Sequence, residues 1–158
     1  MAKMARLGMA AAALGLVVAF GTVAVVAQDK EAQIKTRRDT MKRQGEDFKA
    51  IQEYIKGQAD QAKAEQAIAD LESIAPKIVG LFPAGTGLDA FPGKTGAKPE
   101  IWKEWDKFSA IPKSLIVDEQ KLAAAIKSGD KAAIGGELAN TGKNGCGACH
   151  TPYREKIS

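Results

Sequence analysis

The sequence predicts an all-α domain, built as an antiparallel four-helix bundle. Three observations lead to this fold class. Aromatic residues make up only 6% of the chain, while alanine, lysine, glutamate and glutamine abound. No stretch alternates apolar and polar residues as a half-buried strand does, and apolar residues recur at helical spacings in several long segments. About 130 residues after the N-terminal segment are enough for one domain with one core.

The first two helices are expected over residues 30–56 and about 60–79. Gly57 ends the first helix, and Pro76 is expected to bend the last turn of the second. The apolar faces that predict the two helices are formed by Ile34, Met41, Phe48, Ile51 and Ile55 in the first and by Ala67, Ile68, Leu71, Ile74, Ala75 and Ile78 in the second.

Residues 80–98 are rich in glycine and proline, which predicts a long loop across the bundle end. A third helix should begin at Pro99, and Pro112 should interrupt and kink it. A fourth helix should begin near Gly129 or Asp130, with Gly142 and Gly145 weakening its later turns. The apolar residues of these two helices are Ile101, Trp102, Trp105, Phe108, Leu115, Ile116, Ile134 and Leu138.

A C-x-x-C-H motif lies near the C-terminus, formed by Cys146, Cys149 and His150, and the chain has no other cysteine or histidine. Two thiols at this spacing can each add to one vinyl group of a porphyrin, and the adjacent histidine becomes the axial ligand of the iron. The motif therefore predicts one covalently bound haem c per chain, enclosed by the bundle. Residues 151–158 contain no usual iron ligand, so a sixth ligand must come from upstream.

Other interpretations of the motif are a thiol redox centre, a zinc site and a structural disulfide. A thioredoxin-like centre expects a βαβ pattern around the cysteines, and a closed zinc site needs four ligands where the motif offers three. A disulfide leaves His150 without a role. Haem attachment accounts for all three residues.

The N-terminal segment predicts export. Lys3 and Arg6 precede an uncharged run from Leu7 to Gln28, and Val25 and Ala27 are the small residues that a signal peptidase prefers. Residues 1–27 are therefore expected to be a signal peptide and residues 28–158 the mature domain, located in the periplasm and without stable membrane association. The alternative is that the uncharged run is retained as a membrane-spanning anchor.

Charge argues against nucleic acid as a partner. Removal of residues 1–27 takes away two basic residues and no acid, so 23 − 2 = 21 basic residues face 19 acidic ones. A phosphate-binding surface concentrates lysine and arginine instead. One basic cluster remains, and it is interpreted either as a solvated helix face or as a docking surface for an acidic redox partner. Its members are Lys35, Arg37, Arg38, Lys42 and Arg43.

The mature chain resembles the cytochrome c′ family of c-type cytochromes over its whole length. The matching segments are Arg37-Arg38-Asp39-Thr40-Met41 with Gly45, Leu81-Phe82-Pro83, Pro99-Glu100-Ile101-Trp102, and Cys146 to Arg154. The resemblance implies a four-helix bundle with thioether bonds at Cys146 and Cys149 and an axial His150. It also implies that Arg37 lies near the haem propionates and Arg154 beside the proximal histidine. Members of the family often form homodimers through their first two helices.

Met41 is the only methionine left once residues 1–27 are removed, and it is the one candidate for a His/Met-ligated iron. By the resemblance, the family's distal residue falls at this position. It ligates iron in members that carry electrons, and it only packs over the porphyrin in members that bind nitric oxide or carbon monoxide. We therefore expect one-electron transfer with a periplasmic redox partner and no substrate turnover. Five-coordinate binding of a diatomic gas is the alternative.

Overall fold

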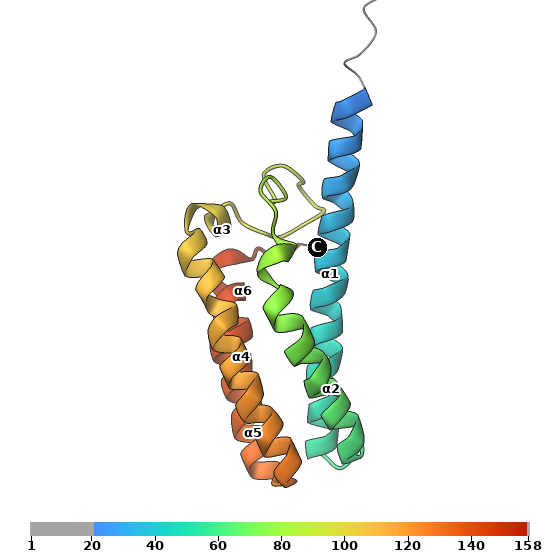
Figure 1. Ribbon diagram of the computed structural model, residues 1–158, viewed down its shortest axis with the longest axis vertical. Coiled ribbons are helices and arrows are strands. Elements are labelled where there is room, and N and C mark those ends of the chain that lie inside the picture. The colour runs from blue at the N-terminus through green and yellow to red at the C-terminus, as the bar shows by residue number, and fades with distance from the viewer. Residues whose placement is uncertain (1–20, 158) are drawn as a thin grey trace, which may run out of the picture.

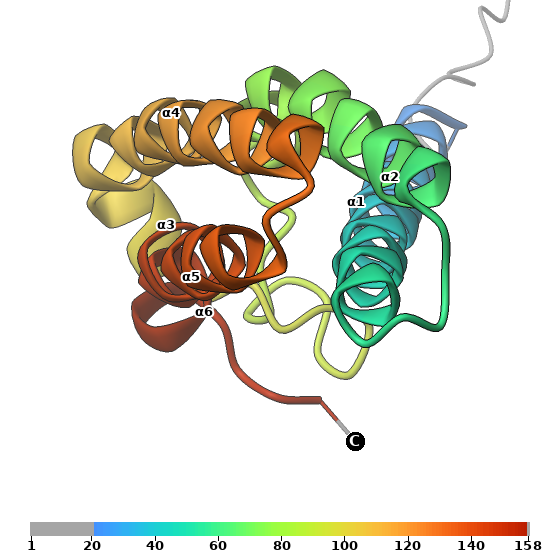
Figure 2. The ribbon, with the colours of Figure 1, turned by 90° about the horizontal axis from the view of Figure 1, so that it is seen from below.

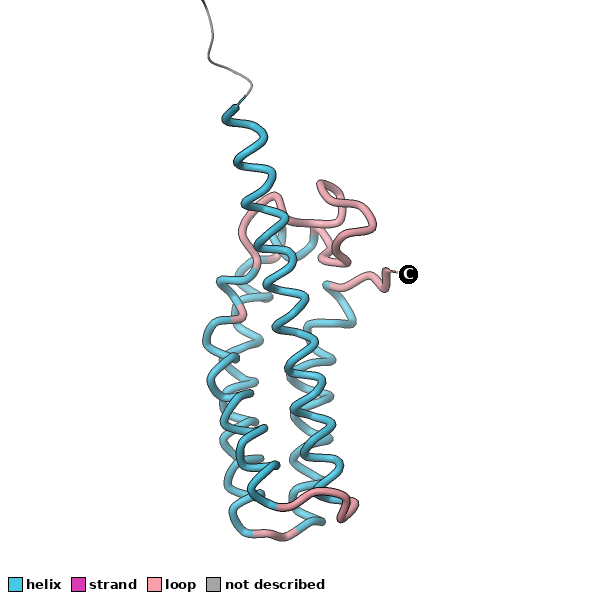
Figure 3. Tube along the Cα trace, turned by 90° about the vertical axis from the view of Figure 1, so that its right-hand side faces the viewer, coloured by secondary structure: helices cyan, strands magenta, loops and turns pink. Residues whose placement is uncertain are grey.

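The computed structural model describes residues 21–157, with side chains from Gln28 onward. Helices dominate this range, and its one β-bridge joins Ala97 to Arg154. In Figure 1, α1 and α4 run down the molecule while α2 and α5 run up, and Figure 2 shows the four of them around one interior. Figure 3 places short connections at one end of the bundle and the long loop with the C-terminal tail at the other. The predicted antiparallel four-helix bundle is confirmed.

Helix α1 spans Gly21–Ile55 and helix α2 spans Gln61–Ile74. Gly57 turns the chain between them with a φ of 74°, and Asp60 caps α2 by accepting a 2.9 Å bond from the Lys63 N–H. Of the predicted signal peptide, residues 1–20 lie outside the described range, so cleavage before Gln28 stays a prediction. Among the helices that the structure describes, none is long and apolar enough to cross a membrane.

The second helix ends earlier than predicted. Helix α2 stops at Ile74 and continues as two short 3₁₀ turns, η1 (Ala75–Lys77) and η2 (Val79–Leu81). Pro76 explains the early end, because it has no N–H to donate to the carbonyl of Glu72 four residues before it. The predicted bend at this proline therefore takes the form of a change of helix type.

Helix α3 covers Glu100–Lys103, and helix α4 covers Trp105–Ser128. The prediction that Pro112 interrupts this helix is wrong, because α4 continues through it and buries it. The break occurs instead at Glu104, where φ is −116° and ψ is 39°. Burial of α4 against α2 and α5 outweighs the one backbone hydrogen bond that Pro112 cannot make.

Helix α5 spans Lys131–Asn140, and the Asp130 carboxylate caps it by accepting from the N–H groups of Ala132 and Ala133. The chain then widens into a π-helical turn, η3 (Thr141–Gly147), before helix α6 (Ala148–Tyr153). This turn lies where glycines were expected to weaken the helix. A Cβ at Gly145 would displace the Leu115 side chain of α4, so glycine lets the turn pack closely against this helix.

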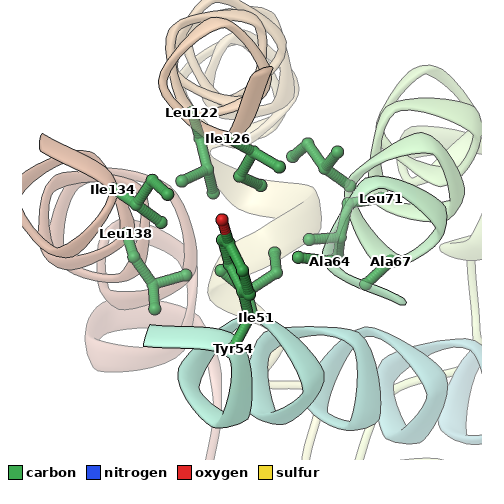
Figure 4. Close-up of a cluster of buried hydrophobic side chains, with 10 residues drawn as sticks. Ile51, Tyr54, Ala64, Ala67, Leu71, Leu122, Ile126, Ile134 and Leu138 are labelled. Carbon is green, nitrogen blue, oxygen red and sulfur yellow. The ribbon is translucent and has the colours of Figure 1, made fainter. Parts of the chain in front are cut away.

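The main hydrophobic core fills the half of the bundle with the short connections. Figure 4 shows side chains from all four helices pointing to one centre, with the Tyr54 ring between them. The Tyr54 hydroxyl lies 3.4 Å from Gln61 Oε1. The cluster is formed by Ile51, Tyr54, Ala64, Ala67, Ile68, Leu71, Leu122, Ile126, Ile134 and Leu138. The half with the long loop has smaller clusters and holds the cavity described below.

Leu122→Ala should lower the free energy of unfolding of the haem-loaded protein by about 2–5 kcal/mol, because the side chain is fully buried among all four helices. Val117→Ala on the same helix is the matched control, since Val117 is 49% exposed. Urea denaturation followed by circular dichroism measures both. Equal losses in the two variants would contradict the packing described here.

Candidate functional site

A cavity of about 440 Å³ opens at the loop end of the bundle between α1, the loop and α6. It brings together five of the six predicted site residues, which come from two segments more than a hundred positions apart in the sequence. They are Arg37, Met41, Cys149, His150 and Arg154. The sixth, Cys146, does not line this cavity. Apolar side chains complete the wall, among them Ile78, Phe82, Ile101 and Phe108.

The cysteines lie on the π-helical turn and the helix that follows it. Cys146 is the sixth residue of η3, Cys149 is the second of α6, and both are half-buried free thiols. Cys149 lines the cavity, and its neighbour His150 lines the same cavity while being exposed to solvent. A π-turn re-aims the side chains that follow it, and such turns occur frequently at functional sites.

The environment of the two thiols disfavours thiolate chemistry. Burial raises the pKa of Cys149 to about 11, with a smaller contribution from Cys146. Burial also raises the pKa of Cys146, and the negative charge of Glu119 adds to this effect. Reactive or zinc-binding cysteines need the opposite shift. Within the described residues, no cluster of three or more His, Cys, Asp or Glu side chains could hold a metal ion. The structure therefore lends no support to the thiol and zinc alternatives.

Arg37 is a buried cation on the cavity wall, only 3% exposed. Its guanidinium donates to the carbonyls of Leu81 and Thr86 at 3.3 and 2.8 Å and to the hydroxyls of Thr86 and Thr95 at 3.0 and 2.7 Å. It also lies 4.7 Å from the centre of the Phe82 ring. No carboxylate forms an ion pair with it within residues 28–157. Burial lowers the pKa of Arg37 to about 10, so the group remains charged at neutral pH.

The basic cluster predicted on the first helix is not one surface. Arg37 points inward, whereas its neighbours are exposed. Lys35 pairs with Asp39, Lys42 with Glu46 and Arg43 with Asp70, so three of the four exposed cations are balanced by nearby carboxylates. Lys42 lies 3.7 Å from Glu46, and Arg38 donates to the carbonyl of Lys94. Both Arg38 and Lys42 also line the cavity.

The C-terminal tail fixes Arg154 beside the histidine. The Arg154 N–H donates to the His150 carbonyl at 3.2 Å. Partial burial of the imidazole lowers the pKa of His150, and the positive charge of Arg154 adds a smaller effect. The tail pairs with the long loop through Lys98 N–H to Tyr153 O and Glu155 N–H to Gly96 O, at 3.0 and 2.7 Å. A Cβ at Gly96 would collide with the Glu155 carbonyl, so only glycine permits this pairing.

Met41 has two sets of neighbours. Its side chain is half-buried and packs against a small core cluster of Ile74, Ala75, Ile78 and Leu115. It also lines the cavity, whose wall includes His150 of α6. This placement suits both a packing residue and an iron ligand, so the geometry leaves the two roles open.

The cytochrome c′ family model matches residues 32–154, which is most of the chain. The chain belongs to the cytochrome c′ family. It is 35% identical over 129 residues to the cytochrome c′ of Pararhodospirillum photometricum, covering 79% of this chain and 98% of that relative.

Two solved structures are similar to this family member at 26% identity, and each match covers 80% of this chain and 97% of the other. One is a cytochrome c′ with an unusual ligand-controlled dimer dissociation, at a TM-score of 0.71. The other is a nitrosyl complex of a variant cytochrome c prime from Alcaligenes xylosoxidans, at a TM-score of 0.67.

The residues present fit the haem that the family carries. His150 offers an imidazole at the cavity, and the two free thiols are the chemical partners of two vinyl groups. Arg37 is a buried cation without a carboxylate partner in the described part of the chain, and it complements the carboxylates of a propionate-bearing ring. The donor set thus agrees with haem c held between α1 and α6.

Sequence reasoning missed three buried polar residues around this site. Thr86 and Thr95 lie in the loop and hold Arg37, and a threonine in a glycine-rich loop gives no signal of burial. Glu119 lies on the inner face of α4, fully buried. It could have been noticed from its place in the heptad-like run of Leu115, Glu119, Leu122 and Ile126.

Arg37→Met should lower the free energy of unfolding by about 2–3 kcal/mol, because it removes charge-assisted hydrogen bonds and leaves the Thr86 and Thr95 hydroxyls without their donor. Amide hydrogen exchange should accelerate in residues 86–97. Arg38→Met is the control, because exposed Arg38 makes only one bond to the loop. Unchanged loop protection in the Arg37 variant would refute its role as a clamp.

Proposed function

We propose that the protein is a periplasmic electron carrier whose haem iron is held by His150 and Met41. The observation that supports this is the shared cavity, since the sole imidazole and the sole thioether of residues 28–158 both line it. When bound, haem supplies a one-electron couple between ferric and ferrous iron. The polypeptide supplies the two axial ligands, the apolar wall and the buried Arg37 charge. No substrate turnover is proposed.

Gas binding is the second candidate function. It is favoured by the packing of Met41 into the apolar cluster of Ile74, Ala75, Ile78 and Leu115, which can hold the thioether away from iron. An open site with an apolar lining suits nitric oxide or carbon monoxide. The similar variant from Alcaligenes xylosoxidans forms a nitrosyl complex.

The proposed redox partner is a protein with an acidic face. Arg38, Lys42 and Arg154 are exposed and line the cavity, so they offer positive charge beside the proposed haem. A homodimer is also proposed, in keeping with the dimer of the similar cytochrome c′ structure.

Export to the periplasm is part of the proposal, because thioether attachment of haem and a cleavable leader occur together in such proteins. The support comes from Lys3 and Arg6 before the uncharged run and from the small residues Val25 and Ala27. Cleavage would leave a chain that starts at Gln28 and carries the whole cavity.

Met41→Leu should convert the spectrum of the oxidised protein from low-spin to high-spin, because leucine keeps the volume but cannot ligate iron. The charge-transfer band from sulfur to iron should disappear, and carbon monoxide should bind the reduced variant at once. Ile78→Val, which trims another cavity-lining side chain, should change none of these. Identical high-spin spectra before and after the Met41 substitution would instead establish the gas-binding function.

The mass of the exported protein should equal that of residues 28–158 plus one haem. A Cys146→Ser, Cys149→Ser double variant should lose its haem to acid acetone, because both thioether bonds are gone. Intact mass spectrometry and the pyridine haemochrome spectrum measure these results. A mass that includes residues 1–27 would instead indicate a retained anchor.

A further inference from the structure

Glu119 is a buried carboxylic acid that the proposed function does not use. It is 0% exposed on the inner face of α4, and neither side-chain oxygen has a hydrogen-bond partner among the described residues. A buried carboxylate without donors is costly, so this group favours its protonated form. Burial, with a smaller effect from Glu72, raises the pKa of Glu119 to about 7.

Glu119 lies beside the segment that anchors the haem. One turn before it, Leu115 contacts Gly145 of the π-turn, and α4 packs along that turn. The negative charge of Glu119 contributes to the raised pKa of Cys146, the first haem-attachment residue. Neither Glu72 nor Cys146 is an iron ligand, and attachment of haem would remove the titratable proton of Cys146.

The other titratable groups on elements packed against α4 leave Glu119 nearly isolated. Glu72 of α2 is half-buried, and its negative charge adds to the effect of burial on Glu119. On the other elements that pack against α4, the cations Lys77, Lys131 and Lys143 are exposed, Glu137 and Cys146 are half-buried, and His150 of α6 lines the cavity. None of these groups contributes to the raised pKa of Glu119. No described cation pairs with the Glu119 carboxyl.

We propose that Glu119 is a redox-linked proton site, which takes up a proton when the haem is reduced and releases it when the haem is oxidised. In the reduction step, one electron from a one-electron donor protein converts ferric to ferrous iron, and one proton from water adds to a Glu119 carboxylate oxygen. Reoxidation by an acceptor protein returns both. The inference rests on the proposed one-electron function but does not depend on whether Met41 ligates iron.

The direction of the coupling follows from electrostatics. Ferric haem carries one more positive charge than ferrous haem and therefore stabilises a nearby carboxylate. Reduction removes this attraction and increases the proton affinity of Glu119. Linkage is reciprocal, so the protonation of Glu119 favours reduction. The reduction potential should consequently fall as pH rises through the neutral range.

Potentiometric titration of the haem-loaded protein at a series of pH values tests the proposal. The wild-type potential should fall across neutral pH, and Glu119→Gln should remove this decline. Asp118→Asn is the matched control, since Asp118 is the adjacent acid on α4 and pairs with Lys121. It should behave as wild type. An unchanged pH slope in the Glu119 variant would overturn the proposal.

Infrared difference spectroscopy tests the proposal on the wild-type protein. The test therefore remains available if the Glu119 variant does not fold. The reduced-minus-oxidised spectrum should contain the carbonyl stretch of a protonated carboxylic acid, and this band should move on labelling with ¹³C-carboxyl glutamate. Reversible reduction without such a band would refute the role of Glu119 and leave electron transfer intact. Failure to undergo one-electron reduction would instead refute the proposed function.

Discussion

The buried positive charge of Arg37 is the constraint on which the loop end of this bundle depends. A guanidinium can be kept out of water only if its donors are satisfied, and here two loop threonines and two carbonyls satisfy them. The loop of residues 82–99 is consequently tied to α1 through Thr86 and Thr95. The C-terminal tail then pairs with that ordered loop and carries Arg154 to the cavity.

Two halves of the molecule therefore have different tasks. The half with the short connections is a closed apolar core contributed by all four helices. The other half is less completely packed and holds the ionisable groups Arg37 and His150 on the wall of a cavity. Stability and function are separated along the bundle axis. Substitutions near the cavity can therefore change the properties of the haem without disrupting the packing of the core.

The sequence was sufficient for the fold class because the apolar periodicity of α1, α2 and α4 is regular, and for the haem motif because its cysteines and histidine are adjacent. It could not locate the break at Glu104, since tertiary packing of α4 decides that Pro112 is tolerated. The π-turn was likewise hidden, because glycines indicate only a weakened helix. The roles of Thr86 and Thr95 depend on contacts between segments distant in the sequence, which no local pattern encodes.

The central claim is that His150 and Met41, which share one cavity, hold the same iron. The electron paramagnetic resonance spectrum of the oxidised wild-type protein at low temperature tests this most directly, because it reports the spin state of ferric haem without any substitution. The account predicts a rhombic low-spin signal from an iron with imidazole and thioether ligands. An axial high-spin signal would show that Met41 leaves the sixth position open, and it would contradict the claim that both residues hold the iron.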